Sequence, residues 1–557
     1  MSLPSIFSFH ENMLHMHSSR KGNSCYAARS LARAARMHLS SIYVTGKSLG
    51  GYMRITNNMI LSNTKGNINS NKLLVYKYNT QMTTQKKISK ASENPVIAIR
   101  SLRLSTTMSQ ITQFADNNIP DAIAWMNVTE NALTNMKDIL TDIRTQCVNG
   151  STDTLTSDDR QTILDNLKAL SEQVYSEGNA EYAGKSVFTG YRTSDTLTFQ
   201  KDEPETTYEI EQKFDYRNLE ETRYYTGDVQ IPEAITESTV PCTTKISENS
   251  FERIRLAYNG DVTIDNFEVS YVDDNGDTQT VATNVTTYET EKEWEAAKQA
   301  AGEDGRVVGD DEVIFIEETG EFIFGKNVAN TISDNKADIK VNYTKKGFGS
   351  GEAKPYYYYD CRDISNDDPR HHVSYTKEDQ KINYTTAANT VTNINTQADQ
   401  IFDTEIQRDV NELVNVVQRS MDANAKVEKL KVMMQEAQYQ DEASQEMLQG
   451  YLDAAQKEAD FADDNMQKTY EHYITRFDKY MENVNIAIID VGSKQNSLSL
   501  TKVRVETQQT TIEELKSNNE DRDISDIIID YYASYNAYTS SLTAAGKLNE
   551  SNLLKYI

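Results

Sequence analysis

The sequence has few of the residues that interrupt helices, and this scarcity is uneven along the chain. Only 8 prolines occur among 557 residues, and none follows Pro369. After residue 398, glycine occurs only at Gly450, Gly492 and Gly546. Because proline and glycine destabilise helix interiors, a stretch of about 160 residues with so few of them predicts long helices.

Cysteine, long apolar runs and positive charge are also scarce. The four cysteines (Cys25, Cys147, Cys242 and Cys361) lie far apart, which argues against a disulfide framework and a structural zinc site. No stretch approaches roughly 18 consecutive apolar residues, so we expect no membrane-spanning helix and no membrane partner. Because 57 Lys and Arg stand against 84 Asp and Glu, the net charge is −27. Nucleic acids and anionic membranes attract clustered positive charge, so neither is an expected partner.

A heptad pattern runs through residues 97–143. Alternating steps of four and three residues from Ile97 meet apolar side chains at eleven of fourteen positions, without a change of phase. The positions are Ile97, Ser101, Leu104, Met108, Ile111, Ala115, Asn118, Ala122, Trp125, Thr129, Ala132, Met136, Ile139 and Ile143. This periodicity predicts a coiled-coil helix. Pro120 lies inside it and is expected to kink the helix, because proline removes one backbone hydrogen bond.

The second half of the chain carries a matching pattern. The same steps from Phe477 give Met481, Val484, Ile488, Val491, Gln495, Leu498, Lys502, Val505, Gln509 and Ile512. A shorter helix is expected to begin near Ser157, with an apolar face made of Ile163, Leu164, Leu167, Leu170 and Val174. We interpret these inner helices as an antiparallel bundle.

The composition changes between about residues 195 and 395 to Tyr, Val, Ile and Thr, which favour strands. Turn dipeptides separate the apolar runs, at Asn259-Gly260, Asn275-Gly276 and Thr319-Gly320. Residues 313–316 and 321–324 are expected to form a hairpin, and residues 289–301 a helix among the strands. The tyrosine run 356–359 is interpreted as a strand with alternating faces.

These patterns predict an α+β fold, in which a long antiparallel coiled-coil rod from both chain ends carries an inserted β-rich domain. The expected segments are an extension at 1–52, a terminal helix at 53–94, the first half of the rod at 95–194, the β-rich domain at 195–395, the second half of the rod at 396–518 and a second terminal helix at 519–557.

The sequence shows no recognisable catalytic, cofactor or metal site. The phosphate-binding loop, the HExxH zinc helix and the GxSxG nucleophile elbow are all missing from it. Neighbouring residues on a strand point in opposite directions, so His371-His372 is interpreted as part of a solvated loop. The acidic segment 273–277 is interpreted as a hairpin turn, because Asn284 stands where a calcium loop needs glutamate. Cys147 is expected in the core, and we predict no enzymatic activity.

Five short segments resemble one family in the correct order. They are MRITNNM at 53–59, ISKASENPV at 88–96, YAGKSVFTGY at 182–191, EDRDISD at 520–526 and LNESNLLKYI at 548–557. Together they resemble the flagellin family and, within it, the hook-associated proteins of the hook–filament junction. The resemblance covers about residues 53–195 and 400–557.

This resemblance implies that the terminal helices pair to form the axial part of the subunit, while the middle domain faces outward. It implies a structural component of the extracellular bacterial flagellum, an adaptor ring between hook and filament that filament assembly and motility need. The implied partners are further copies in a homo-oligomeric ring, a neighbouring hook-associated protein, flagellin and an export chaperone. Export would proceed through the flagellar type III secretion system.

The terminal helices are the expected assembly interface. The stripes at the two chain ends could pair only with each other or with neighbouring subunits. The expected interface residues are Ile55, Met59, Ile68, Val75, Ile524, Ile528, Tyr531, Tyr535, Tyr538, Leu542, Leu553 and Leu554. Two alternatives stay open: a filament-forming flagellin, and an enzymatic domain within residues 195–395.

The first 52 residues differ in composition from the rest. They contain six basic residues and one acidic residue, Glu11, and four of the seven histidines. No apolar core follows an N-terminal charge, so a secretory signal fits poorly. Our hypothesis is that translation starts at Met53, with a leader segment as the alternative.

Overall fold

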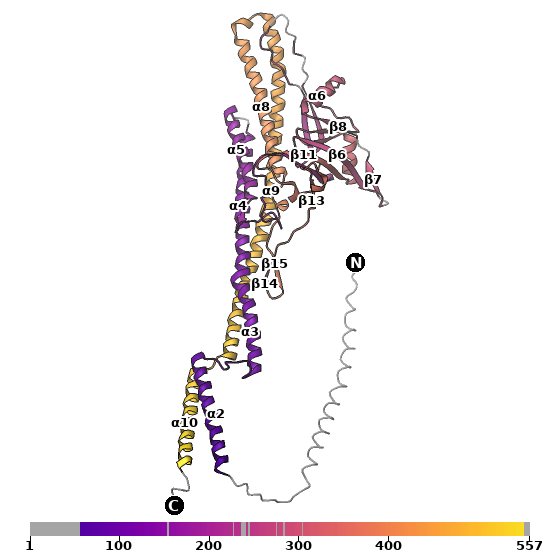
Figure 1. The fold of residues 1–557 in the computed structure, drawn as a ribbon. Helices are drawn as coiled ribbons and strands as arrows, with labels where there is room; N and C mark the ends of the chain where they lie inside the picture. The colour runs from indigo at the N-terminus through magenta and orange to yellow at the C-terminus, as the bar shows by residue number, and fades with distance from the viewer. Residues whose placement is uncertain are drawn as a thin grey trace, which may run out of the picture. The chain divides into compact units, whose positions relative to one another are not determined.

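The computed structural model describes residues 56–152, 155–226, 228–235, 241–242, 246–273, 276–281, 284–303 and 305–550. Helices and sheets are both present, which confirms the mixed α+β class (Figure 1). The chain divides into two compact units, one containing Met1–Ile97 and Glu520–Ile557 and the other Ala98–Asn519. The hypothesis about residues 1–52, and Ile55, Leu553 and Leu554 of the expected interface, lie outside the described residues. No described helix is both long and apolar enough to cross a bilayer.

Long helices form the framework of the larger unit. They are α3 (Pro95–Gln113), α4 (Ile119–Gly150), α5 (Ser157–Glu177), α8 (Glu405–Gln435) and α9 (Glu442–Glu520). Side-chain contacts join α9 to the first helices at three levels: Asp478 to Arg144 (2.7 Å), Gln495 to Asn127 (3.1 Å) and Gln509 to Thr112 (3.3 Å). Along these three contacts the residue numbers rise in α9 and fall in α4 and α3, so the packing is antiparallel with one constant register.

The predicted heptad stripe lies on this packed side. None of its fourteen side chains is exposed, and those from Ile111 to Ile143 are mostly buried. The structure also buries a second row on α4, which ends at Cys147, the one member that was expected in the core. The sequence analysis missed its other members: Ile119, Met126, Leu133 and Leu140. Because α5 packs against α4 as well, α4 is covered on more than one side.

Pro120 is accommodated by a single π-helical turn, Phe114–Asn118, between α3 and α4. Such a turn is a recognised way of absorbing an interruption in the helical hydrogen-bond ladder. The structure therefore has a widened turn next to the proline at which the sequence analysis predicted a kink.

Helix α5 begins one residue after Thr156, as predicted. The Thr156 hydroxyl accepts the Asp159 backbone N–H, and the Asp159 carboxylate accepts the Thr156 N–H. This reciprocal capping satisfies two N–H groups that a helix start leaves unpaired. The expected face is inside, with Leu164, Leu167 and Val174 fully buried.

Two sheets make up the β-rich part of the larger unit, which we call the outer module (residues 203–375). One has the order β4-β5-β10-β9-β8, and the other has the order β13-β12-β3-β11-β6-β7. The first contains β4 (Glu220–Thr226), β5 (Ser247–Arg255), β8 (Asn284–Tyr288), β9 (Glu312–Ile316) and β10 (Glu321–Phe324). The second contains β3 (Glu203–Asp215), β6 (Val262–Val272), β7 (Thr278–Val281), β11 (Asp338–Phe348), β12 (Asp360–Asp363) and β13 (Val373–Tyr375).

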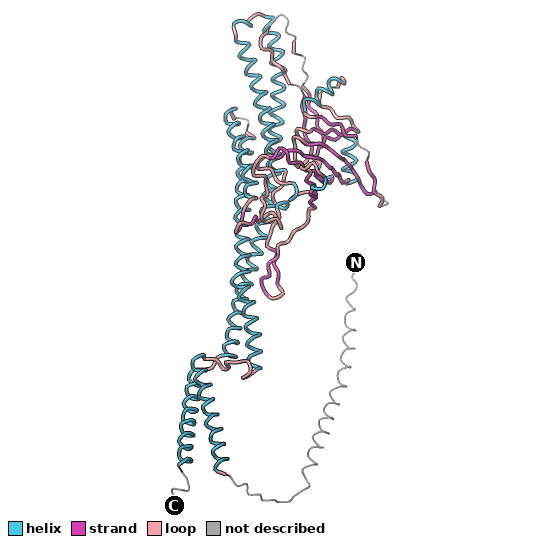
Figure 2. The backbone as a smooth tube through the Cα atoms, viewed as in Figure 1, coloured by secondary structure: helices cyan, strands magenta, loops and turns pink. Residues whose placement is uncertain are grey.

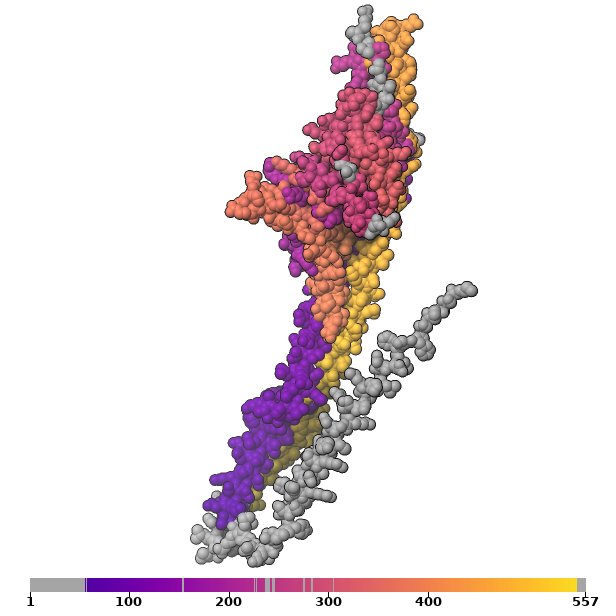
Figure 3. All heavy atoms as spheres, turned by 90° about the vertical axis from the view of Figure 1, so that its right-hand side faces the viewer, coloured from indigo at the N-terminus to yellow at the C-terminus, as the bar shows by residue number. Residues whose placement is uncertain are grey.

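The two sheets share an apolar core, to which helix α7 (Lys326–Asn335) also contributes. Figure 3 shows the outer module covering part of the helices behind it. Two short pairs lie outside these sheets: β1 (Glu181–Tyr182) with β2 (Lys185–Ser186), and β14 (Asn383–Ala387) with β15 (Thr390–Asn393). The β14–β15 hairpin lies beside the helices, where the Asn118 amide donates to the Thr385 carbonyl (Figure 2).

Two local predictions for the outer module are confirmed. Strands β9 and β10 form an antiparallel hairpin around Thr319-Gly320, in which Gly320 adopts a positive φ of 59°. The expected helix is α6 (Glu291–Ala300).

Asn259-Gly260 turns the chain, as expected, and carries it from one sheet to the other, because β5 pairs with β4 and β10 while β6 belongs to the second sheet. One other local prediction needs correction. The tyrosine run contains a 3-10 turn, Pro355–Tyr357, and is not a strand. The Tyr356 and Tyr357 hydroxyls both donate to the Asp195 carboxylate, at 2.6 and 3.2 Å.

Candidate functional site

The smaller unit consists of two helices from opposite chain ends, α2 (Asn57–Thr84) and α10 (Ile524–Glu550), packed against each other. Lys86 pairs with Asp521 at one end, and Asn71 bonds Ser541 farther along, so the helices are antiparallel. Side chains removed from solvent recur mainly at heptad spacing and define an inner face. They are Ile60, Thr64, Ile68, Asn71, Val75 and Tyr78 on α2, and Ile527, Tyr531, Ser534, Tyr538, Ser541 and Ala545 on α10.

The structure divides the expected interface residues between two faces of this pair. Ile68, Val75, Tyr531 and Tyr538 belong to the inner face and contribute to packing within the chain. Met59, Ile524, Ile528, Tyr535 and Leu542 are exposed by 38–46%.

Four of the exposed residues form what we call the outer row of α10: Ile524, Ile528, Tyr535 and Leu542. Residues 528, 535 and 542 are seven apart, so they share one side of the helix. Additional large apolar side chains are exposed in the same unit, including Ile529, Tyr532, Leu73 and Tyr76. Extended apolar exposure of this kind marks surfaces that contact other molecules.

Ile527 is an inner-face residue that the sequence analysis missed. It is fully buried, whereas the predicted stripe passed through the adjacent Ile528. The signal was present in the sequence, because 527, 531, 534 and 538 form an equally regular heptad series. Three consecutive isoleucines made either phase possible, and only the partner helix decides between them.

A set of polar contacts, which we call the clamp, ties the end of α2 to the start of α10. The Lys86 ammonium lies 2.5 Å from the Asp521 carboxylate and 3.1 Å from that of Glu520. Arg522 donates to the Gln81 side chain at 3.0 Å and forms an ion pair with Asp530. The sequence analysis identified the acidic segment 520–526 only as a resemblance and did not foresee these bonds.

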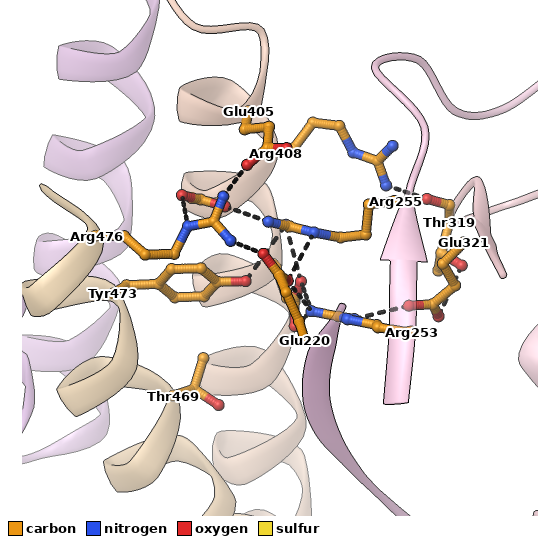
Figure 4. A network of polar contacts seen from close by, with 12 residues as sticks. Glu220, Arg253, Arg255, Thr319, Glu321, Glu405, Arg408, Thr469, Tyr473 and Arg476 are labelled. Carbon is orange, nitrogen blue, oxygen red and sulfur yellow. Dashed lines mark hydrogen bonds and ion pairs between the residues drawn. The ribbon is translucent and has the colours of Figure 1, made fainter. Parts of the chain in front are cut away.

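A second feature, which we call the ionic joint, lies where the outer module meets α8 and α9 (Figure 4). Arg253 and Arg255 lie two residues apart on β5 and therefore on one face of the sheet. Glu220 on β4 is directly opposite Arg253, and Glu321 on β10 is directly opposite Arg255. One sheet face thus presents two arginines and two glutamates to the helices.

The helices present a matching set of charges. Glu405, Arg408, Asp409 and Glu412 occupy one face of α8, because their spacing follows the helical repeat. Arg476 reaches the same region from α9 and forms ion pairs with Glu220, Glu405 and Asp409.

Direct bonds join the two sets. Arg255 lies 2.6 Å from Asp409, and Arg253 lies 2.7 Å from both Glu412 and Glu321. Arg408 donates to the backbone carbonyls of Leu256 and Thr319. Breaking such a pair by removing one partner costs about 3–5 kcal/mol, since the other charge stays buried.

Burial and the neighbouring arginines act in opposite directions on three carboxyl groups of the joint. Burial raises the pKa of Glu412, but Arg253 and Arg255 outweigh it and lower the pKa to about 2. Burial raises the pKa of Asp409 to about 6 in spite of Arg255. Burial and the Asp403 charge raise the pKa of Glu405 to about 7.

The chemistry that these residues offer is contact and ion pairing. Among the described residues, no group of three His, Cys, Asp or Glu side chains could hold a metal ion. Burial raises the pKa values of the Cys147 and Cys361 thiols to about 12, so neither is a reactive thiolate. His371 lies in a short turn and is exposed.

Comparison with known proteins gives a family match for the first part of the chain. Residues 55–193 match the bacterial flagellin N-terminal helical region. The chain is 25% identical over 153 residues to flagellar hook-associated protein 3 of Escherichia coli K12. That alignment covers 27% of this chain and 47% of the relative. Identity to the Salmonella typhimurium protein of the same name is also 25%, over 144 residues, 25% of this chain and 44% of the relative.

Solved structures of similar proteins were also found. A flagellar hook-associated protein from Vibrio parahaemolyticus aligns over 77% of this chain and 100% of its own, with 12% identity and a TM-score of 0.33. Hook-associated protein 3 from Legionella pneumophila aligns over 75% of this chain and 98% of its own, with 10% identity and a TM-score of 0.28.

The chain spans less than half the length of the two curated relatives that it matches. The resemblance predicted from the sequence motifs is nevertheless confirmed: residues 55–193 match the bacterial flagellin N-terminal helical region, and the chain is similar to flagellar hook-associated protein 3.

Proposed function

We propose that this protein is a structural subunit of the bacterial flagellum and forms the adaptor between hook and filament. The observation that carries the proposal is the pairing of α2 with α10, which leaves apolar side chains from both chain ends exposed. A monomer gains nothing from this exposure, whereas a ring of copies would cover it. The similarity to hook-associated protein 3 supports the place in the flagellum.

In this proposal the two chain ends build a coiled-coil rod, and the terminal helices form its axial part. The assembly interface comprises the outer row of α10 with Met59, together with Ile55, Leu553 and Leu554 from the sequence analysis. Ile68, Val75, Tyr531 and Tyr538 support the interface from the inner face. Head-to-tail contacts between identical copies close into a ring when the rotation between neighbours permits it.

The outer module adds bulk at the side of the helices and contributes no chemistry to the proposal. The ionic joint would hold it in one orientation, because each arginine has specific partners on both sides. The proposed partners are further copies of this chain, a neighbouring hook-associated protein, flagellin and an export chaperone. The proposed location is the extracellular hook–filament junction, reached through the flagellar type III secretion system.

Electron microscopy of a strain lacking this protein tests the proposal. We expect intact hooks without filaments, flagellin released unpolymerised into the medium, and loss of motility. Complementation with the full chain should restore filaments. Loss of the flagellin protein itself, with no unpolymerised flagellin in the medium, would instead identify the chain as the filament subunit and overturn the junction role.

A further inference from the structure

Small polar residues interrupt the apolar inner face between α2 and α10, which weakens its ability to specify one register. Thr64, Asn71, Ser534 and Ser541 occupy inner positions that larger apolar side chains would fill in a well-specified pair. Because both faces repeat every seven residues, a slip of one heptad would again place inner residues opposite inner residues. Residues 85–94, between α2 and α3, provide chain length for such a slip.

Arg522 makes contacts with α2 that a slipped register would lose, in addition to an ion pair with Asp530 that stays within the α10 segment. Its guanidinium donates to the Gln81 side chain on α2 at 3.0 Å and forms an ion pair with Asp530 on α10. The same group lies over the Tyr78 ring, 5.4 Å from its centroid. One side chain therefore contacts two residues of α2 and one of α10, and Gln81 is almost fully buried.

Lys86 and the adjacent backbone make the second half of the clamp. The Lys86 ammonium binds the carboxylates of Asp521 and Glu520. The Arg522 N–H donates to the Gln85 carbonyl at 2.9 Å, and the Lys87 N–H donates to the Glu520 carbonyl at 2.6 Å. These bonds need residues 85–87 and 520–522 side by side, which only one register allows.

We propose that Arg522 and Lys86 are positioning residues that fix the register of α10 on α2 and so determine which side chains of α10 face outward. This inference concerns the geometry of the pair and stands independently of the role at the hook–filament junction. Heptad packing holds the helices together in any register, and the clamp selects one of them.

Two cysteine pairs report the register in the full chain, with Cys25 and Cys242 replaced by serine. Asn71→Cys with Ser541→Cys reports the observed register, because the side chains of these residues approach to 3.4 Å. Asn71→Cys with Ser534→Cys reports a slip of one heptad. With the clamp intact, oxidation should cross-link the first pair predominantly.

Arg522→Ala should lower the ratio of observed to slipped cross-link about tenfold, the size expected for one lost charge-assisted bond. Arg522→Lys keeps the charge but cannot reach both partners and should give an intermediate ratio. Lys86→Asp should lower the ratio, and adding Asp521→Lys should restore it. The matched control is Arg103→Ala on α3, an exposed arginine whose loss should leave the ratio unchanged.

An unchanged ratio in both Arg522→Ala and Lys86→Asp would overturn the proposal, since the register would then be set by packing. Equal loss of both cross-links would overturn it as well, because the clamp would then hold the helices together without selecting their alignment.

Discussion

At the scale of single residues, the ionic joint shifts the pKa values of its carboxyl groups in different directions. Glu412 faces both Arg253 and Arg255, and its pKa falls to about 2 even though burial opposes ionisation. Asp409 bonds Arg255 and Arg476 and accepts the Tyr480 hydroxyl at 2.8 Å, yet burial still raises its pKa to about 6. The number of arginines is therefore less important than how completely they offset the loss of water.

Glu412 gives a prediction with a defined pH dependence. A folded-state pKa near 2, below the usual 4.5, means that the carboxylate stabilises the fold fully above about pH 4.5 and that this stabilisation is lost as the pH falls toward 2. Glu412→Gln should therefore lower the free energy of unfolding by about 3–5 kcal/mol at pH 7. Urea unfolding measured from pH 7 to pH 3 should show this penalty shrinking below pH 4.5.

The control is Glu428→Gln on the same helix, where the exposed carboxylate pairs only with Lys431 across the helix surface. It should change stability by less than about 0.5 kcal/mol at any of these pH values. If Glu412→Gln lowers the free energy of unfolding by the same amount at every pH, Arg253 and Arg255 do not offset the burial of the Glu412 carboxylate as proposed.

At the scale of elements, helix α10 has two rows with different tasks. Ile527 is buried against α2, whereas Ile528 in the outer row is 38% exposed. The two isoleucines are adjacent in the sequence, but only one contributes to folding of the smaller unit. The other is available to a neighbouring molecule.

Serine replacements in the outer row should separate assembly from folding. We expect Ile528→Ser, Tyr535→Ser and Leu542→Ser together to leave hydrogen-exchange protection of α10 unchanged and to prevent filament formation at the hook. Ile527→Ala should instead raise exchange throughout α10, because a large-to-small change at a buried position costs about 2–5 kcal/mol. Normal filaments in the triple variant would exclude the outer row as an assembly surface.

Sequence periodicity predicted the helices in which an apolar repeat extends over many turns. It was ambiguous where the position of a partner helix decides which residues are buried. The heptad stripe from Ile97 extends far enough that its phase is unambiguous, and every predicted position lies on the packed side of the helices. In α10 the run 527–529 fits two phases equally, and the sequence does not indicate where α2 will lie.

The ionic joint could not be predicted for a related reason. Arg253 and Arg255 stand in a strand that mixes apolar and charged residues, which usually indicates a solvated face. Their partners Asp409 and Glu412 follow about 150 residues later, so no local pattern links them. A charge on a strand becomes a buried group only once a specific helix covers that face.

At the scale of the whole molecule, the chain contains two units with separate packing. The larger unit has a continuous apolar core along α4 and α9. Among the described residues of the smaller unit, Ile527 is the only apolar side chain that is buried. Stability is therefore expected to reside in the larger unit, with α10 at the low end of the range.

Deleting residues 524–557 tests this division. We expect the main melting transition of the protein to stay within about 2 °C of the full-length value, because the core of the larger unit is unaffected. Motility should be abolished. Leu133→Ala in α4 is the matched comparison and should lower the melting temperature by several degrees, as a fully buried leucine in a core does. A deletion that destabilises the protein as much as Leu133→Ala would show that α10 belongs to the main core.

The antiparallel packing of the first long helices on α9 has a consequence for the order of folding. Arg144 meets Asp478 across 334 residues of intervening chain, and Thr112 meets Gln509 across 397. During synthesis, the first long helices are made more than 300 residues before the parts of α9 that pack against them. Loop closure over such distances is slow, so contacts of this kind form late. A nascent chain therefore cannot complete the packing of its first long helices before α9 has been made.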